Sequence, residues 1–542
     1  MLFASPAPAA SVSIGVSDPG LTYVQARAAA ITGDHARSAE LLAALAAAQP
    51  QDPDLARKAL AEAMGAGQMD LALRLARAIP PARLTSDVRL LLAADELKRR
   101  RPEQALGWLR AKGDNGDLTF LEPLVTAWIA ADRGQLAPAL QAIDAIPVNS
   151  LLGPMRAEQH ALILLKFRRA AEAEAFARRA IGSGGPREIR LRLAFADGFL
   201  AAGDRARAQM MIDGMGTDAP AGRLRILAGK PSGQAIDSLD KAFAETLTAF
   251  AADLARLQRS APPVSLVRVA RYIDPQNSST TLLLALLLDA QERSDEALAL
   301  LRGISQDDAL ISEARDIQAR ILADKKRFDE AYAVAASATA APEPSINDWS
   351  RLGDVLQAMK RDALAADAYG RAVALANAKG ITNDVWSILL LRASALQNAG
   401  RWAEARQALE QGLAIAPNQP LLLNFLGYAK LERGEDIDAA EAMIRKASEL
   451  APDDASIVDS LGWAQYKRGK VAEAIATLQR AAEKDPGQAE IQEHLGDALY
   501  KSGRRFEARY AWEAALVTAE DEVAARVKAK LASGLNPANA AP

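Results

Sequence analysis

The sequence contains no cysteine and only three histidines, so several kinds of functional site are excluded or poorly supplied. Without cysteine there can be no disulfide, no thiol nucleophile and no cysteine-ligated metal. The three histidines, His35, His160 and His494, lie far apart in the sequence. We therefore expect no histidine cluster and no metal site built from such a cluster.

Charge of one sign and long hydrophobic runs are also lacking. The 65 basic and 68 acidic residues are interspersed and give a formal net charge of −3, which argues against the basic face that nucleic-acid binding requires. No stretch reaches the roughly 20 apolar residues of a membrane-spanning helix, and the longest leucine-rich run, 282–288, ends at Asp289. We expect neither a nucleic-acid partner nor a transmembrane segment.

The motifs of common enzyme sites are absent as well. The sequence has no G-x-x-x-x-G-K-[ST] phosphate-binding loop and no H-E-x-x-H zinc motif. The glycine clusters at Gly182 and Gly214 open no strand–turn–helix unit, and no Ser/His/Asp set can be chosen without arbitrary steps. The sequence therefore predicts a protein that is not an enzyme and that has no cofactor.

Alanine dominates the hydrophobic half of the composition, and its spacing is regular. Alanine is the best helix former, so an all-α chain is expected. Small residues recur in steps that are mostly 34 or 35 residues long, and each is preceded by another small residue about twelve positions earlier. The members of the series are Ala105, Ala139, Ala173, Ala208, Ala297, Ala331, Ala365, Ala405, Ala440, Ala474 and Ala508. This pattern predicts two helices per unit, crossing closely where both carry a small residue.

Glycine and proline mark the ends of the predicted helices. A glycine near the end of the first helix supplies a left-handed turn residue, and a proline after the second helix stops it. The glycines are Gly400, Gly434, Gly469 and Gly503, and the prolines are Pro417, Pro452 and Pro486.

Three units carry a more specific pattern, with a Leu-Gly pair in the first helix and Ala or aromatic residues in the second. The matching residues are Trp349, Leu352, Gly353, Ala365, Tyr369 and Ala372; then Leu461, Gly462, Ala474, Ala481 and Pro486; then Leu495, Gly496, Leu499, Ala508, Trp512 and Ala515. The pattern resembles the tetratricopeptide repeat (TPR). This resemblance implies a right-handed superhelical solenoid of about 14 antiparallel helix pairs.

The spacing also predicts boundaries along the chain. The stretch TDAPAGRLRILAGKPSG interrupts the series after Ala208 and resembles an inserted loop, and an amphipathic segment follows the last repeat, where a solenoid needs a polar capping helix. We expect a disordered tail or signal-peptide remnant at 1–20, degenerate repeats at 21–216, an inserted loop at 217–235, central repeats at 236–345, well-formed repeats at 346–520, a capping helix at 521–534 and a disordered tail at 535–542.

A TPR solenoid offers a concave groove lined by the first helix of each pair, so the candidate binding residues come from repeat positions that curvature exposes. Aromatic and polar side chains at these positions have the composition of interaction hot spots. The candidates are Asn424, Tyr428, Asp459, Trp463, Tyr466, Lys467, Glu493, His494, Asp497, Tyr500 and Lys501. The alternative interpretation is that the aromatic residues pack between adjacent repeats.

The last three repeats resemble a proteobacterial group of long TPR proteins, some of which are outer-membrane lipoproteins that deliver substrates to a periplasmic protease. The resemblance is carried by the stretches LLLNFLGYAKLERGE, IVDSLGWAQYKRG and IQEHLGDALYKSGR. It implies an adaptor that binds proteins or peptides in the cell envelope. This chain departs from the group because it has no cysteine to carry a lipid.

Two further hypotheses and two compartments stay open. The chain could be a structural assembly factor for envelope or polysaccharide machinery, or a non-catalytic subunit of an enzyme complex. Ala7-Pro8-Ala9 has the A-x-A pattern of a signal-peptide cleavage site without a basic region or a full apolar segment before it. It indicates either export to the periplasm, with a start upstream of Met1, or a disordered tail on a cytoplasmic protein.

Overall fold

A computed structural model describes residues 18–113, 115–183, 185–257 and 263–541. These residues form thirty α-helices and five short 3₁₀ helices, and no strand is found among them. The chain divides into an N-terminal unit that ends at Asp348 and a C-terminal unit that starts at Trp349.

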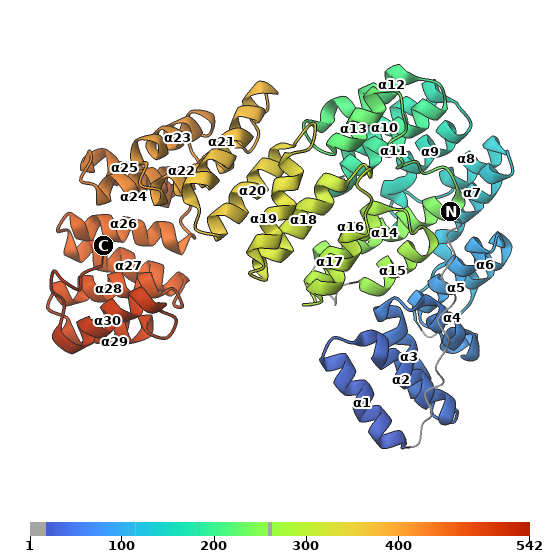
Figure 1. Cartoon of the computed structure of the whole chain (residues 1–542), viewed down its shortest axis with the longest axis horizontal. Helices are drawn as coiled ribbons and strands as arrows, with labels where there is room; N and C mark the ends of the chain where they lie inside the picture. The colour runs from blue at the N-terminus through green and yellow to red at the C-terminus, as the bar shows by residue number, and fades with distance from the viewer. Residues whose placement is uncertain (1–17, 114, 184, 258–262, 542) are drawn as a thin grey trace, which may run out of the picture. The chain divides into compact units, whose positions relative to one another are not determined.

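The N-terminal unit begins with six antiparallel helix pairs, α1 to α12 (Figure 1). Aspartates start the first three helices: the carboxylates of Asp18, Asp34 and Asp52 accept hydrogen bonds from backbone N–H groups of the first turn. The helices are α1 (Pro19–Ile31), α2 (His35–Ala48), α3 (Pro53–Ala66), α4 (Met69–Ala78), α5 (Ser86–Lys98), α6 (Pro102–Arg110), α7 (Glu122–Asp132), α8 (Leu136–Asp144), α9 (Arg156–Lys166), α10 (Ala170–Ser183), α11 (Glu188–Ala201) and α12 (Arg205–Ile212).

The inserted loop expected at 217–235 contains a helix, α13 (Pro220–Leu227), so this expectation was wrong in part. Pro220 occupies the first helical position, where proline is favoured because its missing N–H would have no partner there. The helix packs against α11 and α12 and also against α18 (Ile311–Asp324). It therefore bridges two parts of the N-terminal unit that lie about 100 residues apart in the sequence.

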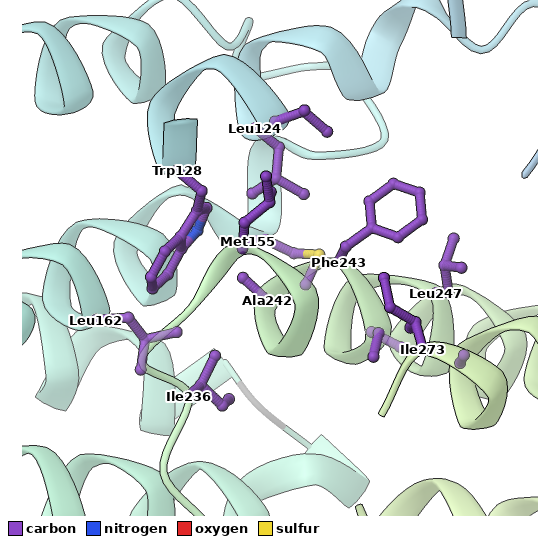
Figure 2. Packing of buried hydrophobic residues seen from close by; sticks show 14 of the residues in the cluster. Leu124, Trp128, Met155, Leu162, Ile236, Ala242, Phe243, Leu247 and Ile273 are labelled. Atoms are coloured by element: carbon purple, nitrogen blue, oxygen red, sulfur yellow. The ribbon is translucent and has the colours of Figure 1, made fainter. Parts of the chain in front are cut away.

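The next helices fold back onto the first array. Helix α14 (Leu239–Leu257) packs against α5 and α7, and α15 (Val264–Ile273) packs against α3 and α5. Figure 2 shows Phe243 and Leu247 of α14 together with Leu124 and Trp128 of α7 and Ile273 of α15 in one buried cluster. The predicted central repeats therefore do not simply extend the array. Their helices α14 and α15 pack onto α3, α5 and α7, which are the first helices of earlier pairs.

Helices α16 to α19 complete the N-terminal unit in two further pairs, and α20 crosses its boundary with the C-terminal unit. The bounds are α16 (Ser278–Asp289), α17 (Ser294–Arg302), α18 (Ile311–Asp324), α19 (Phe328–Thr339) and α20 (Ile346–Ala358).

The C-terminal unit is a linear array of helix pairs that ends with one single helix (Figure 1). Its helices after α20 are α21 (Asp362–Ala378), α22 (Val385–Asn398), α23 (Trp402–Ile415), α24 (Pro420–Glu432), α25 (Ile437–Leu450), α26 (Ala455–Lys467), α27 (Val471–Lys484), α28 (Ala489–Lys501), α29 (Arg505–Ala515) and α30 (Asp521–Ser533). With α13 and α30 set aside, the described residues form fourteen helix pairs, and the predicted all-α solenoid of antiparallel pairs is confirmed.

The C-terminal tail expected to be disordered is folded against α28 as far as the structure describes it. Ala541 is buried, and its backbone N–H donates to an Asp497 carboxylate oxygen at 3.3 Å. Asn539 is also buried and its Nδ2 donates to the carbonyl of Gly534. This short segment, rich in alanine, asparagine and proline, gave no indication of these long-range contacts.

The glycines of the first helices make room for large side chains of the second helices. A Cβ at Gly462 would lie 2.6 Å from Cγ of Leu478, and one at Gly353 would lie 2.5 Å from the Tyr369 ring. Each partner follows its glycine by 16 residues, one turn beyond the small residue that the sequence pattern pairs with it. The predicted turn glycines Gly400, Gly434, Gly469 and Gly503 all have a positive φ, as a left-handed turn requires.

Candidate functional site

An aromatic and ionic cluster lies between α26 and α28, where the sequence predicts groove residues. The Trp463 ring stacks on Tyr466 at 4.7 Å and on His494 at 4.0 Å, with an interplanar angle of 12° in both cases. His494 Nδ1 lies 2.9 Å from an Asp459 carboxylate oxygen. Only 1% of the surface of Trp463 is exposed. We call Asp459, Trp463, Tyr466 and His494 the Trp463 stack.

The charge of His494 depends on its partners in this stack. Burial alone would lower the pKa of His494, but the carboxylate of Asp459, with smaller effects of Asp497 and Glu493, outweighs burial and raises it. The imidazolium–carboxylate pair thus links α28 to α26 in the interior of the unit. Tyr466 is half-buried, and burial together with Asp497 raises the pKa of its phenol to about 12.

A second buried network joins α28 to the terminal helix α30. Lys530 Nζ donates to Glu493 at 2.6 Å and to Asp497 at 2.7 Å, and all three side chains are fully buried. Arg526 donates to Glu493 at 2.8 Å, and Trp512 Nε1 donates to Asp497 at 3.0 Å. We call these five residues the Lys530 network.

Five of the predicted groove residues are therefore inside the protein and not on its surface. Each is less than 9% exposed, and their side chains are committed to neighbouring helices; they are Asp459, Trp463, Glu493, His494 and Asp497. The prediction assumed that every first helix faces an open groove. In the last two repeats the next first helix or α30 covers that face, so these side chains contact each other.

The remaining predicted residues lie at or near the surface. Lys467 and Lys501 are exposed, and their ammonium groups lie 5.3 Å from the Trp463 ring and 4.8 Å from the Tyr466 ring, respectively. Tyr500 is half-buried and its ring lies 5.4 Å from the Trp512 ring. These three residues form a rim above the two buried networks.

Asn424 and Tyr428 lie on α24, which packs against the next first helix, α26. Both are half-buried. Burial, with smaller effects of Glu432 and Asp459, raises the pKa of the Tyr428 phenol, and no described residue accepts or donates a hydrogen bond at its hydroxyl. Asn424 Oδ1 is buried and has no hydrogen-bond partner among the described residues.

Two polar residues that the sequence analysis missed share this feature on neighbouring first helices. The hydroxyl of Ser350 on α20 and Oε1 of Gln397 on α22 are also buried atoms without a partner in the described part of the chain. Ser350 stands at the same repeat position as Asn424, and Gln397 stands at the same repeat position as Tyr466 and Tyr500. Applying these positions to the two preceding repeats would therefore have found both residues. We call Ser350, Gln397, Asn424 and Tyr428 the open face.

In the N-terminal unit, the face formed by the first helices α3, α5 and α7 is covered by the later helices α14 and α15. Arg187 of the 3₁₀ helix before α11 donates to Glu158 of α9 at 3.0 Å and to Glu245 of α14 at 2.9 Å. Burial raises the pKa of Glu158, although Arg187 opposes this effect. Tyr272 of α15 donates to Asp95 of α5 at 2.9 Å, and burial together with this bond raises the pKa of Tyr272 to about 12.

Neither face has the ligands of a metal site. Within the described ranges, no group of three or more His, Asp or Glu residues is arranged to hold a metal ion. Among the residues that the structure describes, no helix has both the length and the apolar character needed to cross a membrane. The chemistry available on the open face is hydrogen bonding and aromatic contact.

Known proteins resemble this chain both in structure and in sequence. In solved structures, it is similar to a chain of the APC/C hetero-tetramer Cut9-Hcn1 (14% identity, 96% of this chain and 97% of that chain, TM-score 0.38). It is also similar to a tetratricopeptide repeat protein from Parabacteroides merdae (14% identity, 47% and 98%, TM-score 0.39).

A curated relative and two family models match in sequence. The TPR repeat-containing protein PA4667 of Pseudomonas aeruginosa is 34% identical over 88 residues, which is 16% of this chain and 15% of that protein. Residues 386–431 match a model described as tetratricopeptide repeat, and residues 462–503 match one described as TPR repeat. These two segments are thus similar to tetratricopeptide repeats, which generally form protein–protein interaction scaffolds, and the spacing of small residues continues the same pattern along the array.

Proposed function

We propose that this protein is a non-enzymatic scaffold that holds a segment of a partner protein on the open face of α20, α22 and α24. The observation that carries the proposal is the set of buried polar atoms there, on Ser350, Gln397 and Asn424, which have no hydrogen-bond partner within the described residues. Leaving such atoms unsatisfied costs about 1–3 kcal/mol each, so a ligand that satisfies them gains affinity.

An extended peptide fits this chemistry. Its backbone presents N–H donors and C=O acceptors at regular intervals, and the hydroxyl and amide groups of the open face can pair with both kinds of group. Tyr428 adds an aromatic contact whose hydroxyl is available to the same ligand. Recognition through backbone groups would tolerate different partner sequences, with Tyr428 selecting for an apolar side chain.

Within this scaffold role, we propose that the chain is an adaptor of the cell envelope that delivers proteins to a protease. The similarity of the last three repeats to envelope TPR adaptors supports this role, and the relative from Pseudomonas aeruginosa matches over part of its length. The periplasm is the proposed compartment, with the cytoplasm as the second possibility; Ala7-Pro8-Ala9 lies outside the described residues.

A photo-crosslinking amino acid at position 428 tests the scaffold proposal. Position 510 is a matched control, because Tyr510 is also a tyrosine, is 72% exposed, and lies on the second helix α29 away from the first-helix face. We expect protein adducts at position 428 in the native host and none of the same adducts at position 510. Adducts at position 510 alone would favour an assembly factor that uses another surface.

The identity of the adducts separates the adaptor role from the assembly-factor and subunit roles. A protease together with its substrates supports the adaptor role. A synthase or polymer-export component supports an assembly factor for envelope or polysaccharide machinery, and an enzyme whose activity rises when this chain is added supports a non-catalytic subunit.

A further inference from the structure

The N-terminal unit carries an apolar groove on a different side from its filled first-helix face. The groove has a volume of about 870 Å³ and is lined by α2, α3, α4 and the residues that follow α4. Alanines form much of its wall, with Ala46 and Ala47 on α2, Ala56 on α3 and Ala78 on α4. Leu71, Leu75 and Ile79 supply larger apolar contacts. We call this site the alanine groove.

The charges around the alanine groove are mainly positive. Its lining includes Arg57, Arg74 and Arg83 but only one acidic residue, Asp52. The Asp52 carboxylate already accepts the backbone N–H of Asp54 at 2.9 Å, and Arg57 is paired with Asp54. Arg74 and Arg83 are exposed and have no hydrogen bond or ion pair with any residue that the structure describes. Two guanidinium groups are thus available beside an apolar surface.

We infer that the alanine groove binds an acidic amphipathic helix of a partner protein. Alanine walls let a third helix lie closer than larger side chains would allow, and the apolar face of that helix would cover Leu71, Leu75 and Ile79. Acidic residues on its edges would pair with Arg74 and Arg83. Guanidinium groups are well suited to this role because they bind carboxylates with two parallel hydrogen bonds.

The placement of the arginines favours a helix over a single-headed amphiphile such as a fatty acid. Arg57 lies on α3, Arg74 on α4 and Arg83 in the 3₁₀ turn that follows α4, so the cations belong to three successive elements. A fatty acid presents one carboxylate, whereas a helix presents several at intervals of one turn. The ten residues of α4 span about 15 Å, which corresponds to roughly three turns of a bound helix.

This inference is independent of the proposed function, because the two surfaces lie on separate units and share no residue. The open face would take an extended segment through uncharged polar groups, and the alanine groove would take a helix through apolar and ionic contacts. The two sites can therefore be disrupted one at a time in the full-length chain.

The test uses two labelled synthetic peptides of about 12 residues, matched to the estimated length of the groove. Both place leucine on one helical face; the first carries glutamate on the edges, and the second carries lysine at the same positions. Fluorescence anisotropy with the full-length protein measures binding. The variants are Arg74→Glu with Arg83→Glu, which reverses the charge, and Ala47→Trp with Ala78→Trp, which fills the groove from both walls.

The matched control is Arg179→Glu on α10, an exposed arginine that does not line the groove. We expect the acidic peptide to bind the parent and the control equally and to lose about tenfold or more in affinity with either double variant. The lysine peptide should not bind the parent. All variants are checked by circular dichroism for unchanged helix content, so that misfolding is separated from lost binding.

Three outcomes would overturn the inference. The first is equal binding of the two peptides, which would show that the arginines do not select for acidic residues. The second is binding of laurate, but not of the acidic peptide, at the alanine groove. The third is self-association of the parent that disappears in the Ala47→Trp, Ala78→Trp variant, which would assign the groove to a second copy of this chain.

Discussion

The two units have similar repeats but treat the first-helix face in opposite ways. In the N-terminal unit, α14 and α15 lie on this face, and its charged groups pair with each other, as Glu158 does with Arg187. In the C-terminal unit, Ser350, Gln397 and Asn424 on α20, α22 and α24 each carry a buried polar atom without a partner within the described residues. The repeat pattern therefore determines how helices pair. Whether the first-helix face is available to a ligand depends on whether later helices, such as α14 and α15, pack onto it.

The two units also differ in the kind of polar residue on the first-helix face. The N-terminal unit has buried ion pairs there, and the C-terminal unit has uncharged polar groups. A buried ion pair such as Arg187 with Glu245 is costly to break, because one charge would stay in the interior without its partner. An uncharged group such as the Asn424 amide costs less when it is buried without a partner, and it can gain a hydrogen bond from a ligand. Five predictions test this contrast, from the largest expected effect to the smallest.

The Phe243→Ala variant should destabilise the N-terminal unit by about 3–5 kcal/mol, because it removes a fully buried ring where α14 covers the first array. Urea denaturation should show that the unfolding transition of the N-terminal unit moves to a lower urea concentration. The transition of the C-terminal unit should not move. Leu254→Ala on the same helix is the control, since Leu254 is 44% exposed, and it should cost less than about 0.5 kcal/mol. Equal effects of the two variants would contradict the filled face.

The Lys530→Met variant should destabilise the end of the C-terminal unit by about 3 kcal/mol, because Glu493 and Asp497 would lose a buried cation. Limited proteolysis should then cut between α29 and α30 faster than in the parent. Lys528→Met, two residues away and exposed, should leave the cleavage rate unchanged. An unchanged rate in the Lys530 variant would show that the network does not hold α30.

The Gly462→Ala variant should cost about 1–3 kcal/mol, because the new Cβ would lie 2.6 Å from Leu478 and α26 would have to move away from α27. Gly107→Ala on α6 is the matched change, since nothing lies within 4 Å of a Cβ there. It should stabilise the N-terminal unit by about 0.5–1 kcal/mol. Chemical denaturation measures both, and two effects of the same sign would contradict the packing role of Gly462.

The stability of the C-terminal unit should fall as pH rises above the ordinary histidine value of 6.5. The pKa of His494 is raised in the folded state, so the stabilisation is complete below the unfolded pKa and is lost as pH rises through the folded pKa. Urea denaturation at a series of pH values measures the free energy of unfolding. The series starts at pH ~6, which lies below the pKa of histidine in the unfolded chain. The His494→Gln variant should lose this part of the pH dependence, and an unchanged profile would assign it to other groups.

The Tyr428→Phe variant should change stability by less than about 0.5 kcal/mol, because the phenol has no hydrogen-bond partner among the described residues. Capture of the crosslinked partners should nevertheless weaken, since the ligand would lose a hydrogen bond. A clear loss of stability would instead show that the Tyr428 hydroxyl makes a hydrogen bond within the folded chain. Tyr510→Phe, on the exposed side of α29, should change neither quantity.

Much of the fold could be predicted from the spacing of small residues, because close packing between paired helices depends on local sequence. The turn glycine Gly469 and the packing glycine Gly462 both appear where the pattern puts them. The return of α14 onto α7 could not be predicted, since its apolar positions would suit a neighbouring pair equally well. Helix α13 was missed because its proline and glycine residues suggested a loop.

The candidate site was predicted less well than the fold, for a related reason. Repeat positions identify which side chains point toward a groove but not what lies over them. Trp463 and His494 occupy such positions and stack on each other, and Glu493 is covered by Lys530 from a helix that the pattern describes only as polar. Asn424 and Tyr428 remain candidates because both side chains are half-buried, whereas Trp463, His494 and Glu493 are buried.

The return of α14 and α15 also determines when the N-terminal unit can complete its fold during synthesis. The bond from Tyr272 to Asp95 spans 177 residues, and the bond from Arg293 to the carbonyl of Gly65 spans 228. At the usual rate of 5–20 residues per second, the ribosome needs roughly ten to thirty seconds to add the missing helices after Asp95 has been made. The apolar face of the first array is uncovered during this interval, so the incomplete N-terminal unit exposes hydrophobic surface while synthesis continues. The C-terminal unit has contacts such as Asp459 with His494, 35 residues apart, and can fold pair by pair as it emerges.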